Sequence, residues 1–122
     1  MADFKWLRNP TLTNELTTTY VSHKGNDSTG DGTAQKPYKT IAKATSEAIA
    51  GTNIMLDDGI WSQQRTLNNR WFKFWGNGAT EINASVVSLN FYWDTFYFLR
   101  AIGLTQQTAS ILFVNCVCKN FL

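Results

Sequence analysis

Short hydrophobic patterns of two kinds follow one another along the chain. Over residues 40–50, small and branched apolar residues recur at helical spacing and polar residues lie between them. Thr40 is a suitable N-cap for this segment, and Gly51 is a suitable residue to end it. We therefore predict one helix over residues 40–50.

After Gly51 the pattern changes to short apolar segments separated by Gly, Asn and Asp. Strands are predicted over residues 53–56, 60–67, 71–75, 80–87, 96–104 and 111–118. One core is expected to contain Ile54, Leu56, Phe72, Phe74 and Ile82. Strands of this length with turn residues between them fit an all-β solenoid or an all-β sandwich.

The segment before the helix combines a short strand over 20–22 with a loop over 25–33 that is rich in Gly, Asn and Asp. Asp27, Thr29 and Asp31 have the spacing of the first half of a calcium-binding loop. The twelfth position of that motif would be Tyr38, where a bidentate Glu is needed. Turn formation by the Asn, Asp and Gly residues is therefore preferred, and no metal site is predicted.

Residues 20–59 as a whole resemble the N-terminal entry of the right-handed parallel β-helix (pectate-lyase-like) superfamily. Later motifs resemble its recurrent strands and corners: GIWSQQ at 59–64, WFKFWGNGATEINA at 71–84, ILFVNC at 111–116 and KNF at 119–121. The resemblance covers residues 20–121. It implies an all-β fold, the start of a right-handed parallel β-helix with about three coils, and one N-terminal capping α-helix laid across the open end.

The same resemblance implies structural corners at Asn77, Asn115 and Asn120. In this family an Asn at a bend adopts a left-handed backbone conformation, and Asn side chains stacked along the solenoid bond to one another.

The charge pattern narrows the class of partner. The 122 residues carry 11 basic and 9 acidic side chains without charged blocks, and the net charge is +2. A nucleic-acid-binding protein normally shows a clustered basic surface, so no nucleic-acid partner is predicted. The apolar runs are too short for a membrane span of about 20 residues, and charges in the first 15 residues argue against a signal peptide.

Two cysteines, Cys116 and Cys118, lie two residues apart. On one strand this spacing is too wide for a disulfide, and a C-x-C pair alone is a poor zinc site. We predict that both are small buried hydrophobic residues.

No catalytic or cofactor-binding motif is present. The acidic residues after the predicted helix are Asp57, Asp58, Glu81 and Asp94, which are isolated or lie in a turn. His23, the one histidine, lies in the loop before the helix. We therefore predict that the chain is not an enzyme, and we expect any active site to lie beyond residue 122.

Four tryptophans of the predicted strands and corners have two alternative roles. They are candidates for stacking on glycan rings, or they pack the junctions between the predicted cap, the leader and neighbouring subunits. The second role is preferred. The residues are Trp61, Trp71, Trp75 and Trp93.

Residues 1–19 form a separate N-terminal leader, and residues 20–122 form the predicted cap and first coils. The leader contains Phe4, Trp6 and Leu7 beside Pro10 but has no sustained periodicity. It is expected either to cover an open face of the following domain or to dock on another protein.

Together these features resemble bacteriophage tail spikes and tail fibres. The resemblance implies a virion structural protein, made in the host cytoplasm, whose leader binds other virion proteins and whose β-helix projects to contact host-surface polysaccharide. It also implies a homo-oligomer, with a trimer favoured. Since the chain stops directly after a strand, more polypeptide or another chain is expected to cover that end. The alternatives are the N-terminal fragment of a secreted polysaccharide lyase or hydrolase, and a carbohydrate-binding β-helix protein.

Overall fold

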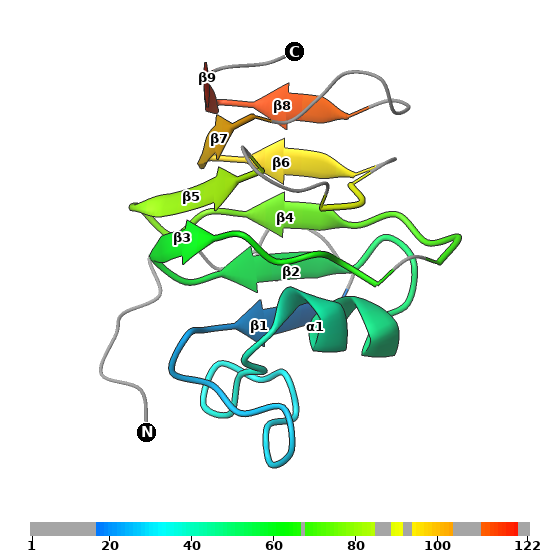
Figure 1. Cartoon of the computed structure of the whole chain (residues 1–122). Coiled ribbons are helices and arrows are strands. Elements are labelled where there is room, and N and C mark those ends of the chain that lie inside the picture. Colours follow the sequence, from blue (N-terminus) through cyan, green and yellow to red (C-terminus); the bar gives the residue numbers. More distant parts are fainter. Residues whose placement is uncertain (1–16, 67, 85–88, 92–93, 104–110, 120–122) are drawn as a thin grey trace.

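The chain folds mainly into short parallel strands with little helix (Figure 1). The computed structural model describes residues 17–66, 68–84, 89–91, 94–103 and 111–119. The elements are β1 (Thr18–Val21), α1 (Ile41–Glu47), β2 (Asn53–Leu56), β3 (Gly59–Trp61), β4 (Lys73–Trp75), β5 (Thr80–Asn83), β6 (Thr95–Tyr97), β7 (Arg100–Ile102), β8 (Leu112–Val114) and β9 (Val117–Lys119).

The strands form two sheets, and the chain passes from one to the other repeatedly. The first sheet has the order β1-β2-β4-β6-β8 and the second has the order β3-β5-β7-β9. All the strand pairs described in both sheets are parallel. We call each pair of consecutive strands, from β2–β3 to β8–β9, a rung. The all-β prediction is confirmed at the level of parallel sheets.

The rungs stack in one continuous register, as the parallel arrows in Figure 1 show. Asn53, Lys73, Thr95 and Leu112 are aligned, so successive rungs begin 20, 22 and 17 residues apart. Four rungs follow the helix, where the sequence predicted about three repeats. The difference arises because the third rung is short, with only 17 residues between its start at Thr95 and the start of the fourth rung at Leu112.

Two predicted strands are each two strands joined at a sharp corner. The segment over 96–104 divides into β6 and β7 at Phe98, and the segment over 111–118 divides into β8 and β9 at Asn115. Both corner residues have a left-handed backbone, with φ of 55° and 54°. A single residue of positive φ redirects the chain without interrupting the apolar pattern. The pattern therefore predicts one strand where the structure has two.

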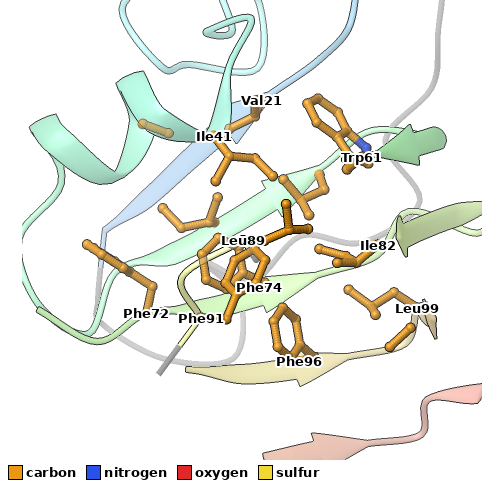
Figure 2. Packing of buried hydrophobic residues seen from close by; sticks show 14 of the residues in the cluster. Val21, Ile41, Trp61, Phe72, Phe74, Ile82, Leu89, Phe91, Phe96 and Leu99 are labelled. Carbon is orange, nitrogen blue, oxygen red and sulfur yellow. The ribbon is translucent and has the colours of Figure 1, made fainter. Parts of the chain in front are cut away.

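The core lies between the two sheets (Figure 2). The predicted core residues are all fully buried, which confirms that prediction: Ile54, Leu56, Phe72, Phe74 and Ile82. Aligned Phe rings continue through the stack, since the ring centroids of Phe74 and Phe96, and of Phe96 and Phe113, are each 5.5 Å apart.

The two cysteines differ in their burial. Cys116 is half-buried against the core, and its thiol donates to the carbonyl oxygen of Phe96 at 3.3 Å. Cys118 is exposed, so the prediction that both are buried is wrong for this residue.

Helix α1 begins where the sequence predicted and ends earlier. The side chain of Thr40 accepts a hydrogen bond from the main-chain N–H of Lys43, which confirms Thr40 as the N-cap. The chain leaves the helix at Ala48, which is extended with ψ of 148°. Gly51, at φ of 86°, therefore lies in the connection to β2, and Ile49 is 63% exposed instead of continuing the apolar stripe.

The loop before α1 is held by turn hydrogen bonds of the predicted kind. The carboxylate of Asp27 accepts from the main-chain N–H groups of Lys39 and Thr40 and from the Thr40 hydroxyl, at 2.7–3.1 Å. Burial opposes ionisation of Asp27, but these hydrogen bonds outweigh it and lower the pKa of its carboxyl group. The Asp31 carboxylate likewise accepts from the hydroxyl and the N–H of Thr33. The Asp side chains of this loop thus serve to close it.

Gly76→Ala tests the stacking of the rungs. A Cβ on Gly76 would lie 2.1 Å from the carbonyl oxygen of Phe98, a main-chain atom of the next rung. We expect the free energy of unfolding to fall by about 1–3 kcal/mol or more, because that carbonyl cannot move without disturbing β6 and β7. Urea unfolding measures the change. Ala79→Ser, at an exposed position of the same corner, should alter stability by less than about 0.5 kcal/mol, and equal effects of the two substitutions would contradict the stacking.

Candidate functional site

The corners between the two sheets differ in length, and the difference creates a notch on the outer surface. Between β4 and β5 the corner has four residues, 76–79, whereas the next two corners have two residues each, at 98–99 and 115–116. The resulting open cavity, which we call the corner notch, has a volume of about 470 Å³. Its lining includes Ala79, Thr80, Glu81, Phe98, Arg100 and Asn115.

The long corner is tied to the rung that precedes it. The hydroxyl of Thr80 is buried, donates to the carbonyl of Asp57 at 3.0 Å and accepts from the N–H of Asn77 at 2.8 Å. The N–H of Ala79 donates to the Asp58 carboxylate at 2.8 Å. One wall of the notch is therefore fixed by hydrogen bonds.

Opposite charges lie side by side within the notch. The Nε of Arg100 is 3.7 Å from a carboxylate oxygen of Glu81, and the two side chains are 46% and 21% exposed. The amide of Asn83 donates to the other Glu81 oxygen at 3.3 Å. Glu81 is thus oriented from two sides, while the Arg100 side chain extends into solvent.

Of the predicted structural corners, Asn77 and Asn115 lie at corners between the two sheets, and Asn115 does not stack on an Asn of the preceding rung. Asn77 is fully buried in the corner between β4 and β5, and Asn115 lies at the left-handed corner between β8 and β9. Asn115 is exposed, and its counterpart in the preceding rung is Phe98. A ladder of Asn amides is therefore absent between these two rungs of the described structure, and the prediction is wrong there. Asn120 lies outside the described residues.

Trp61 and Trp75 are held in packing contacts. Trp61 is fully buried, and its indole N–H donates to the carbonyl of Asp57 at 2.9 Å. Trp75 is half-buried, with one ring face covered by Tyr97 at a centroid distance of 4.1 Å and its N–H bonded to Asn53 at 2.9 Å. Trp61 is therefore unavailable to a glycan, whereas Trp75 packs against side chains of the neighbouring rungs.

Of the remaining predicted binding residues, the structure describes Trp71 alone. Trp71, which directly precedes the buried Phe72, is 43% exposed and so stays a candidate for glycan stacking. Trp93 lies outside the described residues, as do the predicted anchor residues Phe4, Trp6 and Leu7.

His23 lies against the first strand of the second sheet. The first sheet begins one strand earlier, with β1, so β3 has no strand before it in its own sheet. The His23 ring stacks on Trp61 at a centroid distance of 3.8 Å and makes a hydrogen bond with the main chain of Ile60. His23 thus contacts the edge of β3 that faces away from β5.

Stability is expected to fall on acidification because of His23. Partial desolvation of the ring, which stacks on Trp61, lowers the pKa below the usual 6.5, and Lys39 acts in the same direction, while Asp57 and the bond to Ile60 oppose the shift. The unfolded state therefore binds the proton more tightly, and stability is lost as the pH falls below about 6.5. Urea midpoints between about pH 7.5 and pH 5 measure this effect. His23→Gln should flatten the dependence in this window, and an unaltered slope would contradict the assignment.

The charged side chains among the described residues that line the notch are those of Glu81 and Arg100. Of the described residues that line it, Glu81 is the single carboxylate, whereas glycoside hydrolysis generally uses two. In the same part of the chain no cluster of three or more His, Cys, Asp or Glu residues is placed to hold a metal ion. No helix among the described elements has the length and apolar character of a membrane span.

A family match covers a segment of the chain that precedes the residues lining the notch. Residues 23–68 match the family described as "Protein of unknown function (DUF1565)", which is typically found in parallel β-helix proteins. The "Uncharacterized protein YwoF" of Bacillus subtilis (strain 168) is 41% identical over 44 residues, and the match covers 36% of this chain and 9% of that protein. No solved structure matches the chain. The family match spans the loop, α1, β2 and β3, so Glu81, Arg100 and Asn115 lie outside it.

Proposed function

We propose that residues 20–119 form the start of a right-handed parallel β-helix with α1 as its N-terminal cap. The observation that carries this proposal is the continuous parallel register of both sheets through four rungs. The position of α1 beside β1, at the end of the stack in Figure 1, suits a cap, and its buried residues Ile41 and Ala44 belong to the core. Right-handed connection is the strong preference for parallel strands of one sheet.

The proposed role is structural: a tail-spike-like or tail-fibre-like virion protein that projects from the particle toward the host surface. A stack of rungs extends in one direction, because each rung contacts chiefly its neighbours. Such an array suits a projecting stem. In this proposal the leader, residues 1–19, docks to other virion proteins, the subunits associate as a trimer, and the outer surface contacts polysaccharide without cleaving it.

Fractionation of particles tests this proposal. Antibody against the full chain should detect the protein in purified virions, and a variant lacking residues 1–19 should be made but absent from them. A triple substitution of Phe4, Trp6 and Leu7 by Ser should have the same effect, because it removes the apolar contacts of the leader. Normal incorporation of both variants would contradict docking through the leader.

A second candidate is the entry segment of a bacterial carbohydrate-binding β-helix protein outside any virion. A bacterial protein, from Bacillus subtilis, contains a similar segment that makes up 9% of its length. This similarity to a bacterial protein favours the alternative. The same fractionation separates the two candidates. Protein found in the cell envelope or the culture medium, and absent from particles, would favour the second.

A further inference from the structure

We infer that the corner notch binds one sugar unit of a neutral saccharide through adjacent hydroxyl groups, with Glu81 and Arg100 as their partners. The inference rests on the proposed attachment function and assigns its contact to a defined place. That place differs from the four tryptophans that the sequence offered as candidates for glycan stacking, none of which is among the described residues that line the notch.

The notch has the size and the stiffness of a preformed site. Its volume of about 470 Å³ falls within the range of about 300–1,000 Å³ that is usual for small-molecule sites. The hydrogen bonds of Thr80 and Ala79 to the preceding rung fix one wall. Binding therefore requires little ordering of the main chain, which favours affinity.

The polar groups match a pair of neighbouring hydroxyls. The carboxylate of Glu81 accepts hydrogen bonds, while Arg100 only donates them. Their separation of 3.7 Å exceeds the roughly 2.7–2.9 Å of a direct charge-assisted hydrogen bond, so the pair is loose. A sugar supplies one hydroxyl that donates to Glu81 and an adjacent hydroxyl that accepts from Arg100. Arg100 carries further guanidinium N–H groups that can donate to the second hydroxyl.

Further features of the lining distinguish a neutral sugar from an anion. The negative charge of Glu81 balances the positive charge of Arg100, so the notch offers no net positive charge to an anionic group. Val117, which is 58% exposed, supplies an apolar surface for the C–H groups of a sugar ring. The exposed amide of Asn115 offers both a donor and an acceptor.

Binding of the full 122-residue chain to an array of neutral hexose and 6-deoxyhexose oligosaccharides tests the inference. We expect Glu81→Gln and Arg100→Gln each to weaken binding about tenfold or more, since each removes a hydrogen bond to a charged group. Glu47→Gln and Lys43→Gln alter another exposed ion pair, on α1, and serve as matched controls that should leave binding unchanged.

Asn115→Gly provides a variant with little risk to folding. Glycine accepts the left-handed backbone at this position, so stability should be retained while the amide contact is lost. We expect binding to weaken several-fold with an unchanged urea midpoint. Competition by free glucose, galactose and rhamnose separates recognition of a single sugar from recognition of a chain, because only in the first case do the free sugars compete.

The outcomes separate this inference from the proposed function. A chain that binds no neutral glycan, or binds equally well after Glu81→Gln and Glu47→Gln, overturns the inference. If the protein is nevertheless present in virions, the structural role stands without the notch. Notch-dependent binding by a protein absent from virions overturns the virion role alone.

Discussion

Asp94→Ala is expected to lower the free energy of unfolding by about 3–5 kcal/mol, because it leaves a buried guanidinium without its counter-charge. Asp94 is fully buried and Arg65 is 3% exposed. The Nη1 of Arg65 donates to both carboxylate oxygens, at 2.8 and 2.9 Å, and one of them also accepts from the N–H of Phe72 at 2.9 Å. Urea unfolding measures the loss.

The rest of the Arg65 guanidinium explains why the effect should be large. Its Nη2 donates to the side-chain oxygen of Asn68 and to the carbonyl of Arg70, and its Nε donates to the carbonyl of Thr66. The ion pair therefore fixes the connection between β3 and β4 to the residue that precedes β6. Loss of Asp94 disturbs this connection as well as the pair.

Two further variants define the origin of the effect. Arg65→Met combined with Asp94→Leu removes both charges and should recover part of the stability lost in Asp94→Ala. Recovery is partial because the carbonyls of Thr66 and Arg70 and the N–H of Phe72 lose these hydrogen bonds. Glu81→Gln, at the exposed pair with Arg100, should change stability by at most about 1 kcal/mol. A loss below about 1 kcal/mol in Asp94→Ala would show that the buried pair does not hold this connection.

Phe74→Ala is expected to destabilise the chain by about 3–5 kcal/mol, the usual range for a buried Phe. Phe74 is fully buried at the centre of the stack, where its ring packs against Phe91 and Phe96 at centroid distances of 5.2 and 5.5 Å (Figure 2). The surrounding strands are held by their ladders and cannot close fully on the cavity.

Urea unfolding again provides the measurement, with Leu112→Ala as the control. Leu112 belongs to the same sheet but is 60% exposed, so its loss should cost less than about 1 kcal/mol. Similar losses for the two variants would contradict a continuous core between the sheets.

The sequence predicted a strand, a helix cap and the turns correctly, because these features depend on residues that are close together in the sequence. The strand over 53–56 agrees with β2 residue for residue, and Thr40 caps α1 as its side-chain chemistry predicts. The inward alternation of Phe72 and Phe74 indicated the core correctly. The Asp and Asn turns of the loop before α1 were predictable for the same reason, since each bonds to residues nearby or at the adjoining helix start.

The candidate site depended on relations that local patterns do not contain. Glu81 and Arg100 meet because they are aligned in adjacent rungs, and Arg65 meets Asp94 across 29 residues of sequence. Tertiary packing also buried Trp61, for which the sequence allowed either glycan stacking or packing. The physical reason is the same in each case: the register between rungs fixes which side chains become neighbours. Local periodicity specifies which side of a strand is apolar, and only the stacked structure specifies what lies beside it.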